Sequence, residues 1–597
     1  MDFRASALAA NMPSSRAAWQ RQSMATMMAV RCEAERHRGQ VTKLVPMARR
    51  HVSTLLLLLI PAPLISQDTT LRVAFPLVSV GTVEDNYLRY LQSIGEVENY
   101  PWSIRGFGPQ EAQILAADSH GHPPFPGLNE VRRSFFSAHI LPVDGTVRFN
   151  SAFPYGSNDG AIWAGRGFTP AIAGGFVVMA GPISLVLDPV AFVAQNERFT
   201  LMPNGQTGKA AFWSGTFTGA IDLPQRFGDK SYSRIDWGQS ALKADLLGVT
   251  VGISNANLGW GPMQTYEYIL SGNAPGFAHV FAGTAHPINL WLARVHFRGI
   301  WGRLEQSDYS PVQGSKYYSS RIEVGTQRFA TGLVAVLQPG GIPGLELGGG
   351  RFFHSIWPRE GIPRSYLTKS LQSITKSGLP VTPGLADAQG GGDNQEASAF
   401  ARWVFPKSGF EMYGEYGHED HNYDRRDLIQ EPDHSRSYGL GLRKVISADS
   451  TRLTAVRVES INFQMPTLGR NRGEGGIYVH GVLEQGHTSR GQFLGADAGI
   501  GTGAGFTFAL DRFSQHGRSS YTITRTVRQE DGTFYINGIQ NPKSSDVQIG
   551  LGAERVRYLS HLELTTGANL IRELNRDFMT NNWNLNAIVG IRYHAGR

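Results

Sequence analysis

The stretch NLGWGPMQTYEYILSGNAPGF, residues 257–277, gathers aromatic side chains with Asn, Gly and Pro. Its apolar residues lack the 3.6-residue spacing of an amphipathic helix, and its Gly and Pro residues predict a loop. Aromatic rings and amide groups together are suited to the C–H faces and the hydroxyl groups of sugars, because rings cover apolar surface while amides donate and accept hydrogen bonds. The candidate sugar-binding residues in this stretch are Asn257, Trp260, Tyr266, Tyr268 and Asn273.

A second stretch, NDGAIWAGRG at residues 158–167, places Trp163 and Arg166 in one Gly-rich loop. A guanidinium group binds carboxylates through paired N–H donors, so that Arg166 could contact acidic groups of a polysaccharide. The alternative for Arg166 is an ion pair inside the protein. The alternative for Trp260 and Tyr266 is that their rings only complete an aromatic girdle or pack the loop against the rest of the fold.

Other clusters of reactive residues lack the spacing that metal binding or catalysis requires. The run HEDHNYDRRD at residues 418–427 holds two His and several carboxylates, without the ligand spacing of a recognised metal site. GGGDNQ at residues 390–395 has neither a following GK[ST] nor a strand-to-helix context for phosphate. No G-x-S-x-G motif is present. We therefore expect no metal, no cofactor and no catalytic site.

The composition is that of a Gly-rich, charge-poor chain that is apolar enough to fold. The 597 residues include 70 Gly, 41% are hydrophobic and 18% are charged, whereas about 25% are charged in typical globular proteins. The net charge of +7 is spread along the chain, without the Lys/Arg cluster that nucleic acid needs. We expect one large folded unit and no nucleic-acid partner.

The N-terminal residues predict export. A basic pair, an apolar run at residues 55–60 and a Pro-containing processing region have the order of a secretory signal peptide. The apolar run is shorter than the roughly 20 residues of a membrane-spanning helix. Since such a signal stands at the start of a chain, we interpret residues 1–46 as a mis-assigned extension and residues 47–67 as the signal peptide. Cleavage would remove Cys32, the only cysteine, which suits an oxidising periplasm.

The spacing of apolar residues then divides the chain into two parts. Within residues 68–130, helical spacing predicts one helix over 83–94 and a second over 108–119, with Pro109 in its first turn. From about residue 131 to residue 597 the period changes to two, which predicts β-strands. The expected organisation is a small N-terminal helical region followed by an all-β region.

Two strands indicate which kind of β-structure this is. In residues 291–301 and 583–593 one face is apolar, the other is polar, and an aromatic residue stands at each end. Ten steps of about 3.3 Å give roughly 33 Å, and a tilt near 45° leaves about 23 Å, close to the roughly 25 Å apolar band of outer-membrane barrels. A soluble β-sandwich would not need aromatic residues at both borders of that band. We therefore predict a transmembrane antiparallel β-barrel over residues 131–597.

The connections are expected to alternate between tight turns and long loops, as in outer-membrane barrels with short periplasmic turns. Tight turns are predicted at residues 179–184, 246–251, 339–344 and 405–410. Long polar loops are predicted near residues 196–230, 257–275, 359–395, 419–435 and 514–545.

Four segments together resemble the capsule-assembly Wzi family. They are YPWSIRGFG (100–108), SNDGAIWAGRG (157–167), LGWGPMQTYEYILSGNAPGF (258–277) and WGRLEQSDY (301–309). The resemblance extends over residues 87–593 and implies an outer-membrane barrel of about 18 strands with a small periplasmic helical region. It also implies a role in holding capsular or related surface polysaccharide on the cell.

The resulting expectation is a monomeric, non-catalytic, lectin-like protein of the outer membrane. Its partners would be capsular or extracellular polysaccharide and outer-membrane lipid, and a polysaccharide export channel is a further candidate. Many weak contacts to a repeating polymer would act together through avidity. Two alternatives remain: a porin-like channel for small solutes and an outer-membrane hydrolase.

Overall fold

The computed structural model describes most of the chain beyond the expected signal peptide, in one unit within Thr69–Arg597. The predicted extension 1–46 and signal peptide 47–67 lie outside the described residues, as do residues 118–134. The described residues are 77–117, 135–312, 316–319, 322–324, 327–358, 361–375, 393–419, 422, 424–464, 476–480, 483–530, 535–536, 539–540 and 544–595.

Two helices form the N-terminal region, close to their predicted positions. Helix α2 (Val83–Ser93) follows Thr82, whose hydroxyl oxygen accepts a hydrogen bond from the Asp85 backbone N–H at 3.3 Å. The carboxylates of Glu84 and Asp85 lie in the first turn, where their negative charge interacts favourably with the positive end of the helix dipole. Helix α3 (Pro109–Ala117) begins with the proline that the sequence places there.

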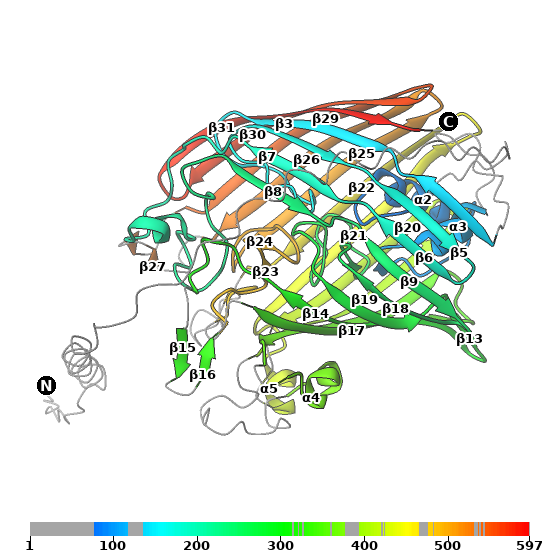
Figure 1. The fold of residues 1–597 in the computed structure, drawn as a ribbon, viewed down its shortest axis with the longest axis horizontal. Helices are drawn as coiled ribbons and strands as arrows, with labels where there is room; N and C mark the ends of the chain where they lie inside the picture. Colours follow the sequence, from blue (N-terminus) through cyan, green and yellow to red (C-terminus); the bar gives the residue numbers. More distant parts are fainter. Residues whose placement is uncertain are drawn as a thin grey trace, which may run out of the picture. The chain divides into compact units, whose positions relative to one another are not determined.

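A single antiparallel sheet of 23 strand segments closes into a barrel (Figure 1). Its segments are β2 (Phe136–Ile140), β3 (Val143–Asn150), β4 (Gly167–Ala173), β5 (Phe176–Ala180), β6 (Ile183–Leu187), β7 (Val190–Ala194), β8 (Tyr232–Asp236), β9 (Ala241–Leu246), β10 (Val249–Ser254), β12 (His279–Thr284), β13 (Ile288–Leu290), β14 (Ala293–Leu304), β17 (Arg328–Pro339), β18 (Leu345–Ile356), β19 (Asp393–Phe405), β20 (Phe410–Glu419), β21 (Arg436–Ala448), β22 (Arg452–Asn462), β25 (Ala504–Ser514), β26 (Gly517–Gln529), β29 (Asp546–Leu559), β30 (Leu562–Arg576) and β31 (Thr580–Tyr593).

Five barrel strands are interrupted, so that β2 continues into β3, β4 into β5, β6 into β7, β8 into β9, and β12 into β13. In each case the two pieces pair with the same neighbouring strands, as β2–β5 and β3–β4 do. Counted this way, the described residues form eighteen strands, the number implied by the family resemblance. Closure comes from β31 pairing with β3, with Val143 opposite Tyr593.

The interruptions occur where the backbone cannot continue a regular ladder. Between β4 and β5, a Cβ atom on Gly175 would lie 1.7 Å from the Leu187 carbonyl oxygen, so that only glycine fits. Between β6 and β7, Pro189 has no backbone N–H to donate to a neighbouring strand. Across these interruptions, β4–β5 and β6–β7 keep a single register against each other. The pairing shifts by one residue between β2–β3 and β4–β5, and again between β6–β7 and β8–β9.

The wall has an apolar outer face and a polar inner face. In β31 the side chains of Trp583, Leu585, Val589 and Ile591 are exposed on the outside, whereas Asn584 and its even-numbered neighbours face inward. β14 shows the same alternation. This confirms the period-two prediction and is the pattern of membrane-spanning barrels.

Tight turns gather at one end of the barrel, and long connections gather at the other. All four predicted tight turns join adjacent strands at the first end, which we call the short-turn end. The turn between β9 and β10 consists of Leu247 and Gly248, both with positive φ, as a two-residue hairpin requires. The opposite, long-loop end carries the connections 151–166, 195–231, 255–278, 305–327, 357–392, 420–435, 463–503 and 530–545, and one short connection at 577–579.

One predicted loop is wrong. Residues 514–545 were expected to form a single loop, but β26 occupies 517–529 and pairs with β25 and β29. Its inward face is made of Ser, Thr and Arg residues, because the lumen is polar, and the strand therefore lacks a strong apolar signal. The long connections at 305–327 and 463–503 were not anticipated.

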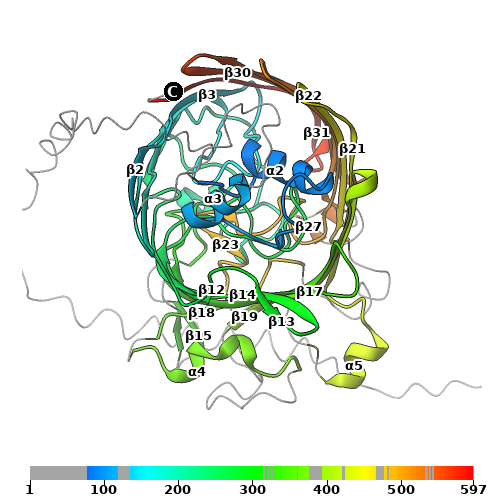
Figure 2. The same ribbon diagram turned by 90° about the vertical axis from the view of Figure 1, so that its right-hand side faces the viewer.

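Helix α2 is fixed inside the barrel by buried charges (Figure 2). The Arg89 guanidinium on α2 donates from Nε to the Glu411 carboxylate of β20 at 2.8 Å, and both side chains are fully buried. Arg402 of β19 also contacts Glu411, at 2.9 Å, and reaches Glu346 at 3.2 Å. The second helix, α3, is tied through Glu111 to Lys243 and Arg298 on the wall, each at 3.2 Å.

The remaining short elements lie in the connections. The helices α4 and α5 lie outside the ring of strands, whereas β23 and β24 lie within it (Figures 1 and 2). No helix among the described residues is both long and apolar enough to cross a membrane. The short elements are β1 (Ile104–Arg105), β11 (Gly259–Trp260), β15 (Lys316–Ser319), β16 (Ile322–Val324), β23 (Thr488–Ser489), β24 (Gln492–Phe493), β27 (Tyr535–Ile536), β28 (Ile539–Gln540), α4 (Arg364–Leu367), α5 (Arg425–Gln430), and the 3₁₀ turns η1 (Gly208–Phe212), η2 (Lys369–Leu371) and η4 (Pro406–Ser408).

Candidate functional site

The aromatic connection 255–278 folds into the lumen, which corrects the expectation that it faces outward. The side chains of Trp260 and Tyr268 are 0% exposed, and that of Tyr266 is 4% exposed. Trp260 belongs to a two-stranded ladder in which β11 pairs with β1 of the N-terminal region, opposite Ile104. These three rings form part of a buried apolar cluster. Trp260 and Tyr268 present no open face to a polymer, whereas Tyr266 borders the cavity described below.

Hydrogen bonds hold the same connection in place. The Tyr266 hydroxyl bonds to Thr507 on β25 at 2.9 Å, and the Tyr268 hydroxyl donates to Glu396 on β19. Asn257, which is also buried, donates from Nδ2 to the Ala274 carbonyl oxygen at 2.9 Å. Asn257, Tyr266 and Tyr268 were predicted to contact sugar, but they make contacts inside the protein. The aromatic rings are buried there because the interior of the lumen is less polar than water.

Asn273 links two of the segments that carry the family resemblance. Its Oδ1 accepts a hydrogen bond from the Asn158 backbone N–H at 2.6 Å, and the Asn158 side chain donates to the Thr265 carbonyl oxygen at 3.2 Å. Its Nδ2 donates to the Gly495 carbonyl oxygen at 2.8 Å. The resemblance segments therefore interlock inside the barrel, and Asn273 lies at the edge of a cavity.

Trp163 lines the same cavity, whereas Arg166 does not. The Trp163 ring packs edge-on against Phe227 and Tyr232, with ring centroids 4.9 and 5.9 Å away, and it remains partly exposed. Arg166 is committed within the protein: its guanidinium donates to the backbone carbonyl oxygens of Ser151 and Arg198. Arg166 therefore makes contacts inside the protein, as the alternative to polysaccharide binding predicted. Its main partners are backbone carbonyl oxygens and not a carboxylate.

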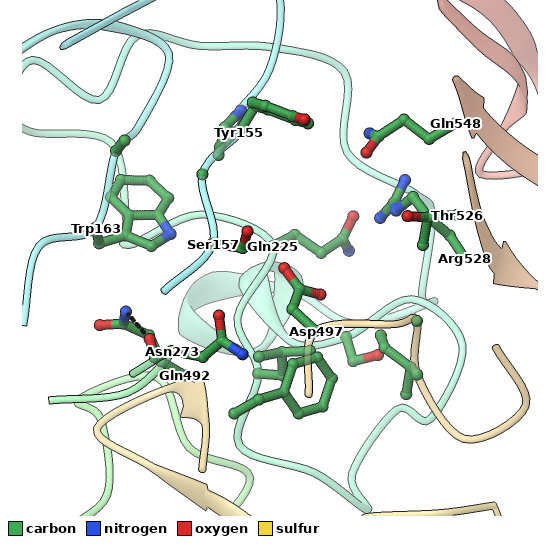
Figure 3. A pocket seen from close by; sticks show the side chains of 18 of the residues that line it. Tyr155, Ser157, Trp163, Gln225, Asn273, Gln492, Asp497, Thr526, Arg528 and Gln548 are labelled. Atoms are coloured by element: carbon green, nitrogen blue, oxygen red, sulfur yellow. Dashed lines mark hydrogen bonds between the residues drawn. The ribbon is translucent and has the colours of Figure 1, made fainter. Parts of the chain in front are cut away.

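The cavity opens within the lumen at the long-loop end and has a volume of about 290 Å³, near the lower limit of roughly 300 Å³ for small-ligand pockets. Five connections, including the short one at 577–579, and the ends of four strands enclose it. Figure 3 shows Trp163 on one side and the strand residues Thr526, Arg528 and Gln548 on the other. Further lining side chains with hydrogen-bonding groups are Tyr155, Ser157, Asp159, Gln225, Asn273, Gln492 and Asp497.

Asp497 is the lining carboxylate with most capacity left to bind. It faces the cavity and makes no hydrogen bond or ion pair with any described residue. The Asp497 side chain is exposed to the cavity, but its position inside the protein raises the pKa of Asp497 above the usual value, because removal from bulk water disfavours the charged form. The nearby Arg528 guanidinium opposes this shift. Asp159, in contrast, already receives the Arg148 guanidinium at 2.8 Å.

The two lining arginines are neutralised by carboxylates behind them. Arg528 lies 3.3 Å from Asp546 and 3.6 Å from Asp577, and it also contacts Glu573. Arg576 contacts Glu573 at 2.8 Å and Asp577 at 3.3 Å. Neither guanidinium is available as an uncompensated positive charge.

A rim groove of about 590 Å³ adjoins the cavity and shares Arg576 and Asp577 with it. Phe153 and Phe199 line this groove, and the Arg576 guanidinium lies 4.2 Å from the centroid of the Phe153 ring. Arg166 is part of this groove and not of the cavity. The groove and the cavity therefore share part of their lining.

The sequence identified only a minority of the cavity. Trp163, Tyr266 and Asn273 were predicted, whereas Gln225, Asp497 and the strand residues were not. Polar residues at alternate positions 524, 526 and 528 of β26 were the one available signal, since these positions face the lumen. The described lining contains Ser157 and Asp497 but no histidine, so that no serine lies beside an imidazole base there.

Comparison with solved structures gives Wzi of Escherichia coli, described as an outer-membrane protein involved in group 1 capsule assembly and a carbohydrate-binding β-barrel. The TM-score is 0.54 at 12% sequence identity, over 87% of this chain and 99% of that chain. OccAB3 of Acinetobacter baumannii gives 0.36 at 10% identity over 76% and 98% of the two chains. The BenF-like porin of Pseudomonas fluorescens Pf-5 gives 0.31 at 10% identity over 77% and 99%.

The similarity to Wzi shows a shared barrel fold, and the two lower scores carry no further argument. No protein-family model matches the sequence, and no curated protein matches it.

Proposed function

We propose that the protein is an outer-membrane barrel that binds surface polysaccharide in the lumenal cavity and holds it at the cell, without catalysis. The apolar outer wall supports a place in a membrane, and the short turns would face the periplasm. The exported location rests on the signal-like residues 47–67. Outer-membrane lipid would surround the wall, and a monomer suffices because one chain closes the barrel.

The cavity is the observation that carries this proposal. It places the Trp163 ring, amide side chains such as Gln225, and the Asp497 carboxylate around one space at the long-loop end. A ring packs on the C–H face of a sugar while amides and carboxylates bond its hydroxyls. Wzi, described as a carbohydrate-binding barrel, has the same fold, which supports this reading of the cavity.

The porin alternative predicts an open path through the lumen. Here α2, the connection 255–278 and their buried contacts occupy the lumen between the cavity and the short-turn end. Those contacts favour a binding protein over a channel. A polysaccharide export channel is a further partner under this proposal, at the short-turn end.

Two measurements test the proposal. Deletion of the gene should move surface polysaccharide from the cell-bound fraction to the released fraction without lowering its total amount, and the wild-type gene should restore retention. The purified protein in detergent should bind the same polysaccharide directly. Unchanged retention in the deletion strain, with normal surface abundance in the control, would contradict the anchoring role while leaving the barrel intact.

A further inference from the structure

Carboxyl groups outnumber guanidinium groups around the cavity, in contrast to the basic balance of the whole chain. Its two lining arginines and the Arg148 partner of Asp159 provide three positive charges. The carboxylates paired with them or lining the cavity number five among the described residues: Asp159, Asp497, Asp546, Glu573 and Asp577. The group therefore contains two more carboxyl groups than guanidinium groups, although the whole chain carries a net charge of +7.

The hydrogen-bonding capacity of the cavity points the same way. Asp497 is an acceptor without a partner among the described residues. An ionised carboxylate can only accept hydrogen bonds, so its ligand must supply donor groups. Sugar hydroxyls are such donors. Arg528 and Arg576, the groups that would recognise an acidic sugar, are already held by Asp546, Glu573 and Asp577.

A ligand carboxylate in this cavity would lack a free counter-charge. It would have to give up its hydration near Asp497 and displace an existing ion pair to reach a guanidinium. A hydroxyl-bearing sugar without an acidic group meets neither cost. It keeps its hydrogen bonds by exchanging water for Asp497, Gln225 and the neighbouring amides.

We propose that the cavity selects a sugar unit without an acidic substituent, whose hydroxyls donate to Asp497. This inference rests on the proposed function, since it names the class of sugar that the cavity binds. Acidic units elsewhere in the same polymer would lie outside the cavity.

The test uses the surface polysaccharide of the same cells in three chemical forms, with the purified full-length protein in detergent. One form is native, in the second the carboxyl groups are reduced to primary alcohols, and in the third the primary hydroxyls are oxidised to carboxylates. We expect the reduced form to bind at least as tightly as the native form, and the oxidised form about tenfold more weakly, which is about 1.4 kcal/mol.

The outcomes separate the two proposals. If none of the three forms binds, polysaccharide binding itself fails. If the oxidised form binds as tightly as the reduced form, or more tightly, the protein binds polysaccharide but the selection against acidic sugars is wrong.

Asp497→Asn supplies the second measurement, because it keeps the size of the side chain and removes its charge. This variant should bind the reduced form several-fold more weakly and lose most of the discrimination against the oxidised form. Asp308→Asn is the matched control, since Asp308 is an exposed carboxylate on a long-loop connection that does not line the cavity. Migration that changes on boiling would show that both variants retain the barrel. Undiminished discrimination in Asp497→Asn would overturn the role of this carboxylate.

Discussion

Trp163 and Trp260 are similar residues in the sequence, yet the structure gives them different surroundings. Both stand in Gly-rich loops and both were predicted to contact polysaccharide. Trp163 remains partly exposed at the cavity, whereas Trp260 is 0% exposed inside the lumen. The distinction matters for mutagenesis, because one substitution should affect binding and the other should affect stability.

Replacing Trp163 with alanine should weaken binding of the native polysaccharide by roughly fivefold to tenfold, about 1 to 1.4 kcal/mol. The physical reason is the loss of the aromatic surface on one side of the cavity. Affinity can be measured by titration with the purified polymer. Trp291→Ala is the control, since Trp291 is 95% exposed in the short turn before β14 and lies far from the cavity in sequence and fold. Equal effects of the two substitutions would contradict the assignment of Trp163.

Asp497 predicts a pH dependence of binding. The ionised carboxylate accepts stronger hydrogen bonds from hydroxyls than the neutral acid does, and burial raises the pKa of Asp497 above its usual 3.8. Affinity should therefore increase as the pH rises through that raised pKa, and a titration from about pH 4 to about pH 8 covers the range.

The stability contribution of Asp497 has the opposite sign. Because its pKa is higher in the folded protein, the group favours the folded state at low pH, and this contribution is lost as the pH rises. Asp497→Asn should flatten the pH dependence of binding. A wild-type affinity that does not change with pH would argue against hydroxyl donation to this carboxylate.

At the scale of elements, the connection 255–278 and helix α2 act as structural inserts. The connection pairs with β1, interlocks with residues 157–167 and packs its rings under the cavity. Helix α2 is held through Arg89 and its neighbours on the wall. These inserts position the site without supplying most of its lining.

Trp260→Ala should lower the free energy of unfolding by about 3–5 kcal/mol, the usual cost of truncating a buried tryptophan. The affinity of the molecules that remain folded should be nearly unchanged, because Trp260 does not line the cavity. Thermal unfolding in detergent and binding at a matched folded fraction measure the two quantities. If the variant had normal stability but lost its affinity, Trp260 would have to be assigned to the binding site.

Glu411→Gln should loosen helix α2. The substitution leaves the buried Arg89 and Arg402 guanidiniums without their shared carboxylate, at a cost of about 3–5 kcal/mol for a broken buried pair. Protease should then cut within residues 77–117 at concentrations that spare the wild type. Glu554→Gln is the control, because its pair with Arg518 is partly exposed and should cost at most about 1 kcal/mol. Identical digestion of all three proteins would show that α2 does not depend on this ion pair.

At the scale of the whole molecule, the barrel wall and its contents make separate contributions. The wall is closed by the β31–β3 pairing and has an apolar outer face. The contents of the lumen decide whether the barrel conducts. In planar bilayers the wild type should show no sustained ion conductance, because α2 and the connection 255–278 occupy the lumen.

Removing residues 77–117 should open a conducting path, provided that boiling still changes the migration of the variant. The control is the full-length protein reconstituted at the same density. Sustained conductance of the wild type, equal to that of the shortened variant, would favour the porin-like alternative.

The amino-acid sequence by itself determined the wall. Period-two alternation in residues 583–593, the helical spacing of α2 and the turn residues near 247 and 409 are local signals, and each was confirmed. The alternation predicted for residues 291–301 was confirmed from Ala293 onward, whereas Trp291 lies in the preceding turn. The weakest strand signal came from β26, whose polar inner face hid it within a predicted loop. Patterns spanning a few residues are sufficient to predict a strand or a helix wherever one face of that element contacts an apolar environment.

Only the tertiary structure decided what the loops do. Residues 257–277 carry the composition of a sugar-binding loop, yet the lumen buries their rings, and Asp497 became a site residue through neighbours more than two hundred residues away, such as Gln225. The spacing of residues along the sequence does not indicate which loops fold into the lumen and which remain outside it. That choice depends on long-range packing and on where each buried polar group finds its partner.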